Sequence, residues 1–419
     1  MERIPEAELS IAHTPAASFI PAPLRRAGFR RLWVGMTLSY TGDRLQQLAQ
    51  GWLVAIITGS ALAVGWIAFF GSLPLLLGPL GGVIADQVNR RPLLVAGQLV
   101  GAAVTAVVAL LVVLQQIAIW HIYVWALVNG VITLLSRPAY KVMITNAVPP
   151  EEVRPAVAIN SMTETGAMVG SNAGGSLLLG WLGLPIAFVL NTVSYLAAAG
   201  ALGQLEDRDQ AADAGGNSLA IRYILSDLRA GFEYLLRQPQ LLHPLLLTFV
   251  TITITVPAVG LLPAIVHGQG GSIISLGMLT AAFSMGALAG AAFAGARYEG
   301  ERSTRTYAFF GLVAAAALAV FASLPVTLLA AIPLGVLGFV SFAQAVWNTS
   351  RIGLVAAAPY QARLQAITSL AFNLGFSVGM LWGGVAIDRF GLSALSAGAV
   401  VLGVLCVIVA VSAHRSLPT

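Results

Sequence analysis

Long apolar stretches separated by short polar intervals run along the whole chain. Twelve of them have the roughly 20 residues that an α-helix needs to cross a bilayer. They lie at about 32–57, 62–85, 92–114, 119–144, 156–180, 183–204, 242–264, 275–296, 305–323, 326–348, 364–386 and 392–413. Six precede the longest polar interval, 205–240, and six follow it. The pattern predicts an all-α polytopic membrane protein with 12 transmembrane helices in two six-helix bundles.

A glycine pattern of the fifth stretch returns in the eleventh at a constant offset of 209 residues. Gly166, Gly170, Gly174 and Gly175 are matched by Gly375, Gly379, Gly383 and Gly384, and Pro150 and Arg154 by Pro359 and Arg363. Six matches at one offset indicate a duplicated chain, and hence two pseudo-symmetric bundles. Small residues at every fourth position let helices approach closely, so we expect these glycines to pack between the bundles. Static packing and a moving interface both fit the pattern.

The composition excludes an ordinary soluble protein. Of the 419 residues, 58% are hydrophobic and only 9% are charged, with a mean hydropathy of +0.85, whereas soluble proteins carry about 25% charged residues. A single cysteine, Cys406, excludes an intrachain disulfide and a cysteine metal cluster. The five histidines are scattered, and neither a phosphate-binding loop nor a nucleophile–base set is present. We therefore expect no enzyme, no cofactor and no metal.

The basic residues fall on one side of the predicted spans. With the N-terminus in the cytoplasm, the outer loops hold only Arg389. The inner loops then hold Arg90, Arg91, Arg154, Arg208, Arg222, Arg229, Arg237, Arg297, Arg302, Arg305, Arg351, Arg363 and Arg415. This asymmetry predicts that both termini are cytoplasmic. It also explains the net charge of +5 without a nucleic-acid partner.

These features divide the chain into five parts. The predicted domains are a flexible cytoplasmic tail (1–24), an N-terminal bundle (25–204), a cytoplasmic linker (205–240), a C-terminal bundle (241–413) and a second tail (414–419). Within the linker, residues 219–237 alternate apolar and charged positions at helical spacing. An amphipathic helix on the inner membrane face and a solvated connector helix both fit this segment.

Five charged residues are predicted to be buried or nearly buried within the spans, all in the first half: Asp43, Arg44, Arg137, Lys141 and Glu164. A charge at the bilayer centre costs about 2.5–3.5 kcal/mol on insertion scales, so each needs a partner or a task. We expect Asp43 to bind a proton or cation. We expect Arg137 to hold an anionic substrate group or to tune a buried acid. Glu164 projects away from the glycine face, towards Arg44 or Arg137, and is either a structural ion pair or functional.

Polar residues form stripes at helical spacing on the first, fourth, seventh and tenth spans. The stripes are Tyr40, Asp43, Gln47 and Gln50; Asn129, Thr133, Arg137 and Lys141; Thr248, Thr251 and Thr255; and Ser341, Gln344, Asn348 and Arg351. Polar faces in apolar spans point at water or protein. The stripes therefore line a central aqueous cavity or form packed polar seams. Our candidates for the proton or substrate site are Asp43, Glu164, Arg137, Gln47, Asn129, Gln344 and Asn348.

Several motifs resemble those of a known family. The loop after the second span, Gly82-Val-Ile-Ala-Asp86-Gln-Val-Asn-Arg90-Arg91, resembles the loop signature of the major facilitator superfamily, with Asn89 at the usual glycine. The glycines of the fifth span resemble its antiporter signature, with Ser171 at the usual proline. Gly42-Asp43, Thr58-Gly59-Ser60 and Arg137-Pro138-Ala139 resemble the transmembrane secretion effector branch, which contains enterobactin-type exporters and relatives of macrolide efflux pumps.

The resemblance implies alternating access, in which two bundles rock about a site near the bilayer midplane. It also implies a cytoplasmic gate at Gly82, with Asp86 accepting from Arg90 or Arg91. We expect a monomeric secondary transporter in the lipid bilayer of a bacterial inner membrane that exports a small amphipathic compound, drug-like or siderophore-like, in exchange for protons. The alternatives are a proton-independent facilitator or lipid flippase of the same fold, and a non-transporting membrane sensor.

Overall fold

The structure is a computed structural model that describes residues 21–205, 220–296, 304–325 and 328–415, and every regular element in these ranges is a helix. The first half of the chain contains α1 (Ala22–Arg25), α2 (Ala27–Thr58), α3 (Ala61–Ser72), η1 (Pro74–Leu77), α4 (Gly78–Gln87), α5 (Arg90–Val113), α6 (Ile119–Asn146), η2 (Pro150–Glu152), α7 (Val153–Leu182) and α8 (Pro185–Gly203). The second half contains α9 (Ala220–Leu236), α10 (Pro239–Gly260), α11 (Leu262–Gly268), α12 (Ile273–Ala296), α13 (Thr304–Ser323), η3 (Leu328–Ala330), α14 (Ala331–Val355), α15 (Ala358–Phe390) and α16 (Ala394–Arg415).

Helices occupy all twelve of the predicted apolar stretches. By length and composition, eight of the described helices are able to cross a membrane, and two shorter apolar helical segments accompany them. The second predicted stretch is broken into α3, η1 and α4, and the seventh into α10 and α11. Pro74 and Pro79 lie at the first break, and Pro257 and Pro263 flank the second. A proline has no backbone N–H and its ring clashes with the preceding turn, so helices break or bend there.

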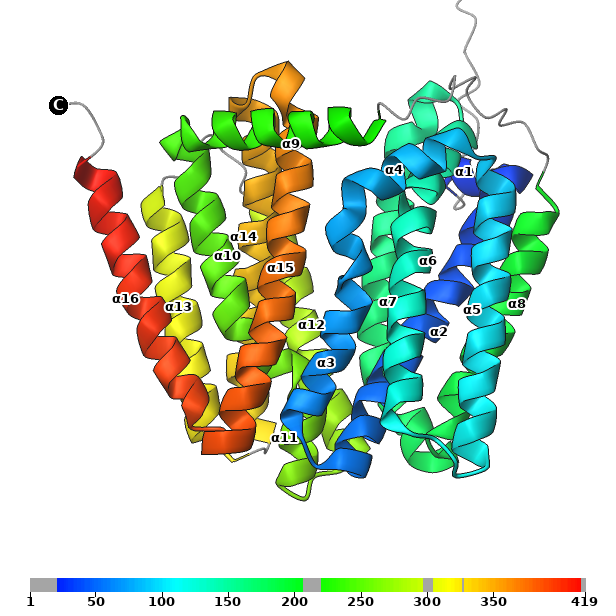
Figure 1. Cartoon of the computed structure of the whole chain (residues 1–419), viewed down its shortest axis with the longest axis horizontal. Helices are drawn as coiled ribbons and strands as arrows, with labels where there is room; N and C mark the ends of the chain where they lie inside the picture. Colours follow the sequence, from blue (N-terminus) through cyan, green and yellow to red (C-terminus); the bar gives the residue numbers. More distant parts are fainter. Residues whose placement is uncertain (1–20, 206–219, 297–303, 326–327, 416–419) are drawn as a thin grey trace, which may run out of the picture.

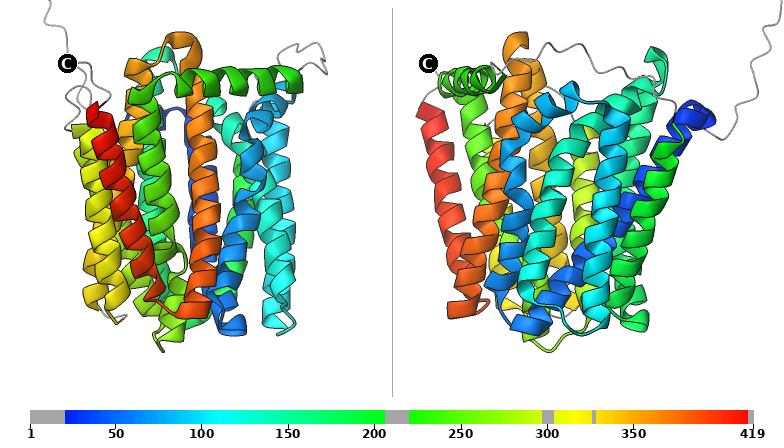
Figure 2. Two further views of the ribbon diagram at one scale, coloured as in Figure 1. Left: turned by 60° about the vertical axis from the view of Figure 1, so that its left-hand side comes forward. Right: turned by 45° about the vertical axis from the view of Figure 1, so that its right-hand side comes forward.

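The long helices stand side by side, and α9 lies across one end of them (Figures 1 and 2). We call this end, which also carries α1 and α4, the linker end. The opposite end, which carries α11 and the connections at Gly59, Gly183 and Gly391, is the hairpin end. The three glycines have φ of +62°, +81° and +74°, values that side chains disfavour, so each of these turns depends on glycine.

The two halves of the chain meet mainly through α3 on α15, α7 on α12 and α2 on α11. A Cβ on Gly65 would lie 2.7 Å from the Met380 carbonyl oxygen, so α3 and α15 touch through backbone there. Nearby, the Ser72 and Ser377 hydroxyls are 2.5 Å apart. On α7, Asn172 Nδ2 donates to Ser284 Oγ at 2.8 Å. Small and polar side chains therefore form the seam between the halves.

The duplicated glycines form little of this seam, contrary to the prediction. A Cβ at Gly166, Gly170 or Gly174 would meet no atom within 4 Å, and one at Gly175 would meet Leu45 of its own half at 2.7 Å. Gly375, Gly379 and Gly383 face Thr253, Val256 and Pro257 of α10, again within one half. Only Gly384 faces the other half, where a Cβ would lie 2.6 Å from Leu62 Cα. The reason is that α15 lies close along α10, so its glycine face is used inside the second half.

The amphipathic segment of the linker is α9, which is attached to the second half. A Cβ on Gly231 would lie 3.0 Å from Arg363 Cβ, so α9 and α15 are close at this point. An Arg363 Nη2–Asp227 Oδ1 ion pair of 2.7 Å joins the same helices. The rings of Tyr234 and Tyr360 stack with centroids 4.2 Å apart. These contacts fix α9 across the linker end.

Candidate functional site

Asp43 is a partly buried carboxylate of α2 that is anchored through one oxygen. Its Oδ1 accepts hydrogen bonds from the Tyr195 hydroxyl and from Asn191 Nδ2, the latter at 3.2 Å. Its Oδ2 makes no hydrogen bond within the described ranges. The carboxylate is therefore held in place while one oxygen is left to bind a proton or a cation.

Both anchoring residues come from α8, and glycines on two neighbouring helices make room for them. A Cβ on Gly42 of α2 would overlap the side-chain amide of Asn191, which is fully buried. A Cβ on Gly101 of α5 would lie 3.1 Å from Tyr195 Cζ. Asn191 Nδ2 also donates to Gln46 Oε1 at 2.6 Å. The buried Asn191 amide is thus satisfied, which is what a low-dielectric interior requires, whereas Gln46 Nε2 has no hydrogen-bond partner among the described residues.

The Tyr195 hydroxyl continues the network to α6. It accepts a hydrogen bond of 3.0 Å from Asn129 Nδ2, and Thr133 Oγ1 donates to Asn129 Oδ1 at 3.3 Å. Arg137 lies one helical turn further along the same face of α6. Through Tyr195, the predicted polar stripe of α6 is therefore joined to Asp43.

A charged cluster lies next to this network. Glu164, Arg137, Asp43 and Arg44 all act electrostatically on the Tyr40 hydroxyl, so the four charges share its neighbourhood. Arg44 Nη1 donates to Gln47 Oε1 at 3.0 Å, and Gln47 is exposed.

Glu164 and Arg137 are also exposed, and no direct ion pair joins Glu164 to either arginine in the part of the chain that the structure describes. Instead, Glu164 Oε1 accepts a 3.0 Å hydrogen bond from Asn160, which in turn accepts one of 2.7 Å from Tyr140. The ion pair considered for Glu164 is therefore absent in this conformation, because Asn160 on its own helix holds the carboxylate.

The polar stripes of the second half are packed rather than exposed to a cavity. Gln344 is fully buried and donates to the Tyr307 carbonyl oxygen at 3.1 Å. Asn348 is 5% exposed and donates to Thr248 Oγ1. Arg351 Nε donates to the Gln240 carbonyl oxygen at 2.7 Å. In this conformation Gln344 and Asn348 thus form a polar seam between α10, α13 and α14, because partners on those helices take up their donors.

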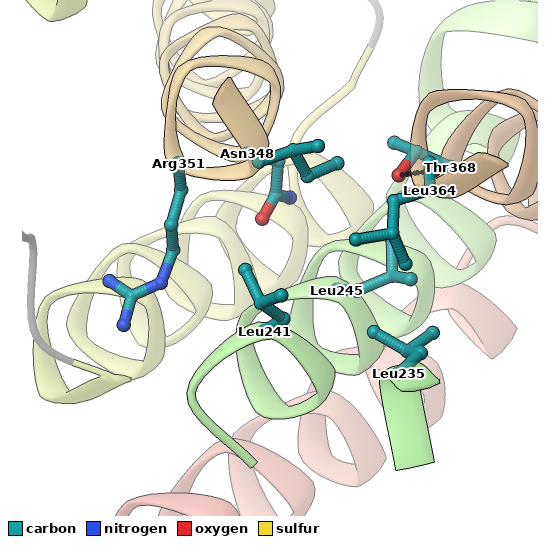
Figure 3. A pocket seen from close by; sticks show the side chains of 8 residues that line it. Leu235, Leu241, Leu245, Asn348, Arg351, Leu364 and Thr368 are labelled. Atoms are coloured by element: carbon teal, nitrogen blue, oxygen red, sulfur yellow. Dashed lines mark hydrogen bonds between the residues drawn. The ribbon is translucent and has the colours of Figure 1, made fainter. Parts of the chain in front are cut away.

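A small pocket adjoins this seam at the linker end (Figure 3). Its lining is Leu235, Leu241, Leu245, Asn348, Arg351, Ile352, Leu364 and Thr368, from α9, α10, α14 and α15. Most of these side chains are apolar, and Asn348 and Arg351 already have protein partners. The pocket is therefore an extension of the packed seam.

The predicted gate motif lies where α4 meets α5 at the linker end. Arg91 Nη2 donates to the Gly203 carbonyl oxygen at the end of α8, a favourable place for a cation. Gly82 has open space on its Cα, and Arg90 has a partner of its own. The side chain of Asp86 lies outside the part that the structure describes, so the latch between Asp86 and the arginines stays a prediction.

Two charged contacts were not anticipated from the sequence. Arg26 Nε and Nη2 donate to the two carboxylate oxygens of Glu152 at 2.8 and 2.9 Å, and this bidentate pair holds the pKa of Glu152 below its usual range. At the hairpin end, Asp388 of α15 accepts from Ser60 Oγ and from the Ala61 and Leu62 backbone N–H groups. The polar residues that precede the apolar run at Ala61 indicate a helix start, but nothing local points to Asp388.

Comparison with protein families decides the identity of the chain. The family described as transmembrane secretion effector, of the major facilitator superfamily, matches residues 17–418. The chain belongs to this family. As a major facilitator transporter, it is a multi-pass membrane protein that transports rather than catalyses a reaction.

Two curated relatives of this transporter are similar over part of their length. An uncharacterized MFS-type transporter, YfiS of Bacillus subtilis, is 25% identical over 221 residues, which are 52% of each chain. Macrolide efflux protein A of Streptococcus pyogenes is 22% identical over 151 residues, 36% of this chain and 37% of the relative. The matches thus span about half of the first relative and a little over a third of the second.

Solved structures share the fold of this major facilitator transporter. A bacterial homolog of the human lysosomal transporter Spinster, in an inward-facing and occupied conformation, has a TM-score of 0.69 with 14% identity, covering 94% of this chain and 98% of that one. The nucleoside transporter NupG has a TM-score of 0.67 with 12% identity, covering 92% and 98%. At these identities the likeness concerns the fold alone.

Proposed function

We propose that this transporter exports a small amphipathic compound from a bacterial cell by proton antiport with alternating access. In the proposal, twelve helices cross the inner membrane in two pseudo-symmetric bundles, α2–α8 and α10–α16, and both termini are cytoplasmic. The observation that carries it is the half-anchored carboxylate of Asp43 beside a charged cluster. A proton site needs a carboxylate that is shielded enough to hold a proton and open enough to release it.

The distribution of contacts supports a conformation that is open at one end. The described hydrogen bonds between the halves, such as Ser72 with Ser377 and Asn172 with Ser284, lie in the middle and at the hairpin end. Towards the linker end, Gly166 and Gly170 have empty space beside them, and Met162 is 75% exposed. The arginine distribution supports a cytoplasmic location of the linker end. The conformation is then inward-facing, the state in which the exporter loads its substrate.

In this proposal the charged cluster contains two binding sites, one for the proton and one for the substrate. Asp43 binds the proton on Oδ2, and Arg137 or Arg44 holds an anionic group of the substrate. Arg137 suits this role because it is exposed and makes no hydrogen bond or ion pair in the described ranges. Protonation of Asp43 and occupation of the arginines then bias the equilibrium between the two open states, as any ligand with different affinities for two states does.

Proton movement in vesicles tests the proposal. The full chain is reconstituted into proteoliposomes with a pH-sensitive dye, and compounds that are toxic to a deletion strain are added. We expect substrate-driven pH change in the wild type and none with Asp43→Asn. Transport of several good substrates without proton movement would overturn the antiport and favour a facilitator or flippase. An Asp43→Asn strain with an intact phenotype, and no transport by the wild type, would favour a sensor.

A further inference from the structure

We infer that Tyr195 is the positioning residue that couples the proton site to the substrate site. Its hydroxyl is the described hydrogen-bonded link between Asp43 on α2 and the polar face of α6. The inference rests on the proposed function, because it assumes that Asp43 binds the transported proton. The inference adds Tyr195 to the candidate site, although its helix, α8, carries none of the polar stripes predicted from the sequence.

The donor and acceptor groups determine the direction of the hydrogen bonds that run from Asn129 through Tyr195 to Asp43. Asn129 Nδ2 is a donor only, so the Tyr195 oxygen accepts from it and the Tyr195 proton points at Asp43 Oδ1. Asn191 donates to the same oxygen. Oδ1 is thus occupied by two donors, and an arriving proton binds Oδ2. The carboxyl group keeps its position in both protonation states.

The effect of protonating Asp43 is transmitted to α6 through these hydrogen bonds. Hydrogen bonds in series polarise one another, so a carboxylate strengthens both the Tyr195–Asp43 bond and the Asn129–Tyr195 bond. Neutralising Asp43 weakens both and loosens Asn129 and Thr133, one turn from Arg137. The charged group that acts on Asp43 directly is Arg44 on its own helix, while Arg137 on α6 and Glu164 on α7 act on the neighbouring Arg44 and Tyr40. Tyr195 is the group on α8 through which hydrogen bonds run from Asp43 to Asn129 and Thr133 on α6.

Substitution of the hydroxyl tests the inference. In proteoliposomes, Tyr195→Phe keeps the ring against Gly101 but removes a donor to the charged carboxylate. We expect the pH at half-maximal transport to rise by about one unit, since that donor favours the charged form. Tyr123→Phe is the matched control, because its hydroxyl donates only to the Ala63 carbonyl oxygen. A wild-type pH profile for Tyr195→Phe, or an equal shift for Tyr123→Phe, would overturn the inference.

A second variant separates the inference from folding and from the proposed function. Asn129→Ala breaks the hydrogen-bond chain on the α6 side and leaves the Tyr195–Asp43 bond, so we expect a several-fold higher KM and a pH midpoint that rises less than in Tyr195→Phe. If Asp43→Asn stops proton movement while both other variants behave as wild type, only the coupling role fails. If Asp43→Asn still moves protons, the proposed function fails first.

The geometry points independently to a clasp at the hairpin end, formed by Asp388 and the start of α3. Asp388 Oδ1 accepts from the Ala61 N–H at 2.7 Å, and Oδ2 accepts from Ser60 Oγ at 2.5 Å and the Leu62 N–H at 3.1 Å. The first N–H groups of a helix have no partners within it, and the helix dipole favours a negative charge there. The Asp388 carboxylate of the second half thus accepts hydrogen bonds from N–H groups of the first half that have no partner within α3.

The clasp stabilises the conformation that is closed at the hairpin end. One turn earlier on α15, Gly384 lets the backbone approach Leu62 closely, so Asp388 is brought over the helix start. When the halves separate at this end, the hydrogen bonds from the Ala61 and Leu62 N–H groups to the Asp388 carboxylate are broken. The span formed by α3 and α4 then has a carboxylate contact at its start, in addition to the predicted Asp86 latch at its other end.

Cysteine accessibility tests the clasp. In a Cys406→Ser background with Ser377→Cys as reporter, an impermeant maleimide is applied from the hairpin side. Loss of charge-assisted hydrogen bonds in Asp388→Ala raises the labelling rate about tenfold or more, and Ser60→Ala, which removes one of the three bonds, raises it less. Arg389→Gln is the control and leaves the rate unchanged. Equal labelling in wild type and Asp388→Ala would overturn the clasp.

Discussion

Gly42 on α2 lies against the side chain of Asn191 on α8 so closely that a Cβ at Gly42 would overlap the Asn191 amide oxygen. Asn191 is fully buried and one of the two residues that anchor Asp43. The approach of α2 to α8 is therefore part of the site.

Gly42→Ala is expected to damage both stability and transport. The added methyl group must displace Asn191 or Ser194, and overpacking of this kind costs about 1–3 kcal/mol. Thermal unfolding of the purified transporter measures the cost, and vesicle assays measure the loss of proton coupling. Gly200→Ala on α8 is the matched control, since open space surrounds Gly200 and alanine favours helix. Equal stability of the two variants would contradict the close approach.

Arg137→Gln is expected to raise KM at least about tenfold for a substrate that carries a carboxylate, because a charge-assisted hydrogen bond is lost. An uncharged analogue of the same substrate should be transported with unchanged KM. Lys141→Gln, one turn further along α6, tests whether any lost cation has this effect, because Lys141 is not among the groups that act on Tyr40 or Arg44. A KM change that is independent of substrate charge would remove Arg137 from the substrate site.

Periodicity and hydropathy carry most of the helix assignment. The predicted stretch 119–144 is α6, Ile119–Asn146, and 183–204 is α8, Pro185–Gly203. The break after α3 was missed, although Pro74 and Pro79 lie in the stretch, because a hydropathy window averages over single residues. Hydropathy indicates that a segment is apolar and helical, but not where its backbone bends.

The site was only partly predictable for a related reason. Asp43 and Arg137 stand out in the sequence because a charge in an apolar span is costly wherever it lies. Asn191 and Tyr195 are as important to the geometry, but a single amide and a single phenol in an apolar span look like ordinary packing residues. Their role depends on the contact of α8 with α2, and a stripe on one helix does not say which helix it faces. For the same reason the sequence left open whether Gln344 lines a cavity or packs in a seam, and in this conformation it packs.

Glu152→Gln is expected to weaken the linker-end contact in a pH-dependent way. The bond to Arg26 lowers the pKa of Glu152 in the folded protein, so its contribution to stability is present above the unfolded-state pKa of about 4.3 and disappears as pH falls through the folded-state pKa. The free energy of unfolding should therefore be lower for Glu152→Gln than for the wild type at about pH 6 to 7, and this difference should vanish in acid. Glu151→Gln is the control, because Glu151 acts on Arg26 through its charge but makes no hydrogen bond or ion pair in the described ranges, so it should show a smaller pH-dependent difference. A pH-independent difference would mean that the charge is not involved.

Asn348→Ala distinguishes a packed seam from a cavity wall in the second half. Asn348 is buried and donates to Thr248, so its removal leaves an orphaned hydroxyl and should cost about 1–3 kcal/mol of stability. If the seam is structural, the pH midpoint of transport and the KM stay unchanged in the variant. Ser341→Ala, on the same stripe of α14 but without a hydrogen bond among the described residues, should leave stability within about 0.5 kcal/mol. A large KM change at normal stability would instead show that Asn348 meets substrate in another conformation, because a residue that only packs cannot alter affinity without altering the fold.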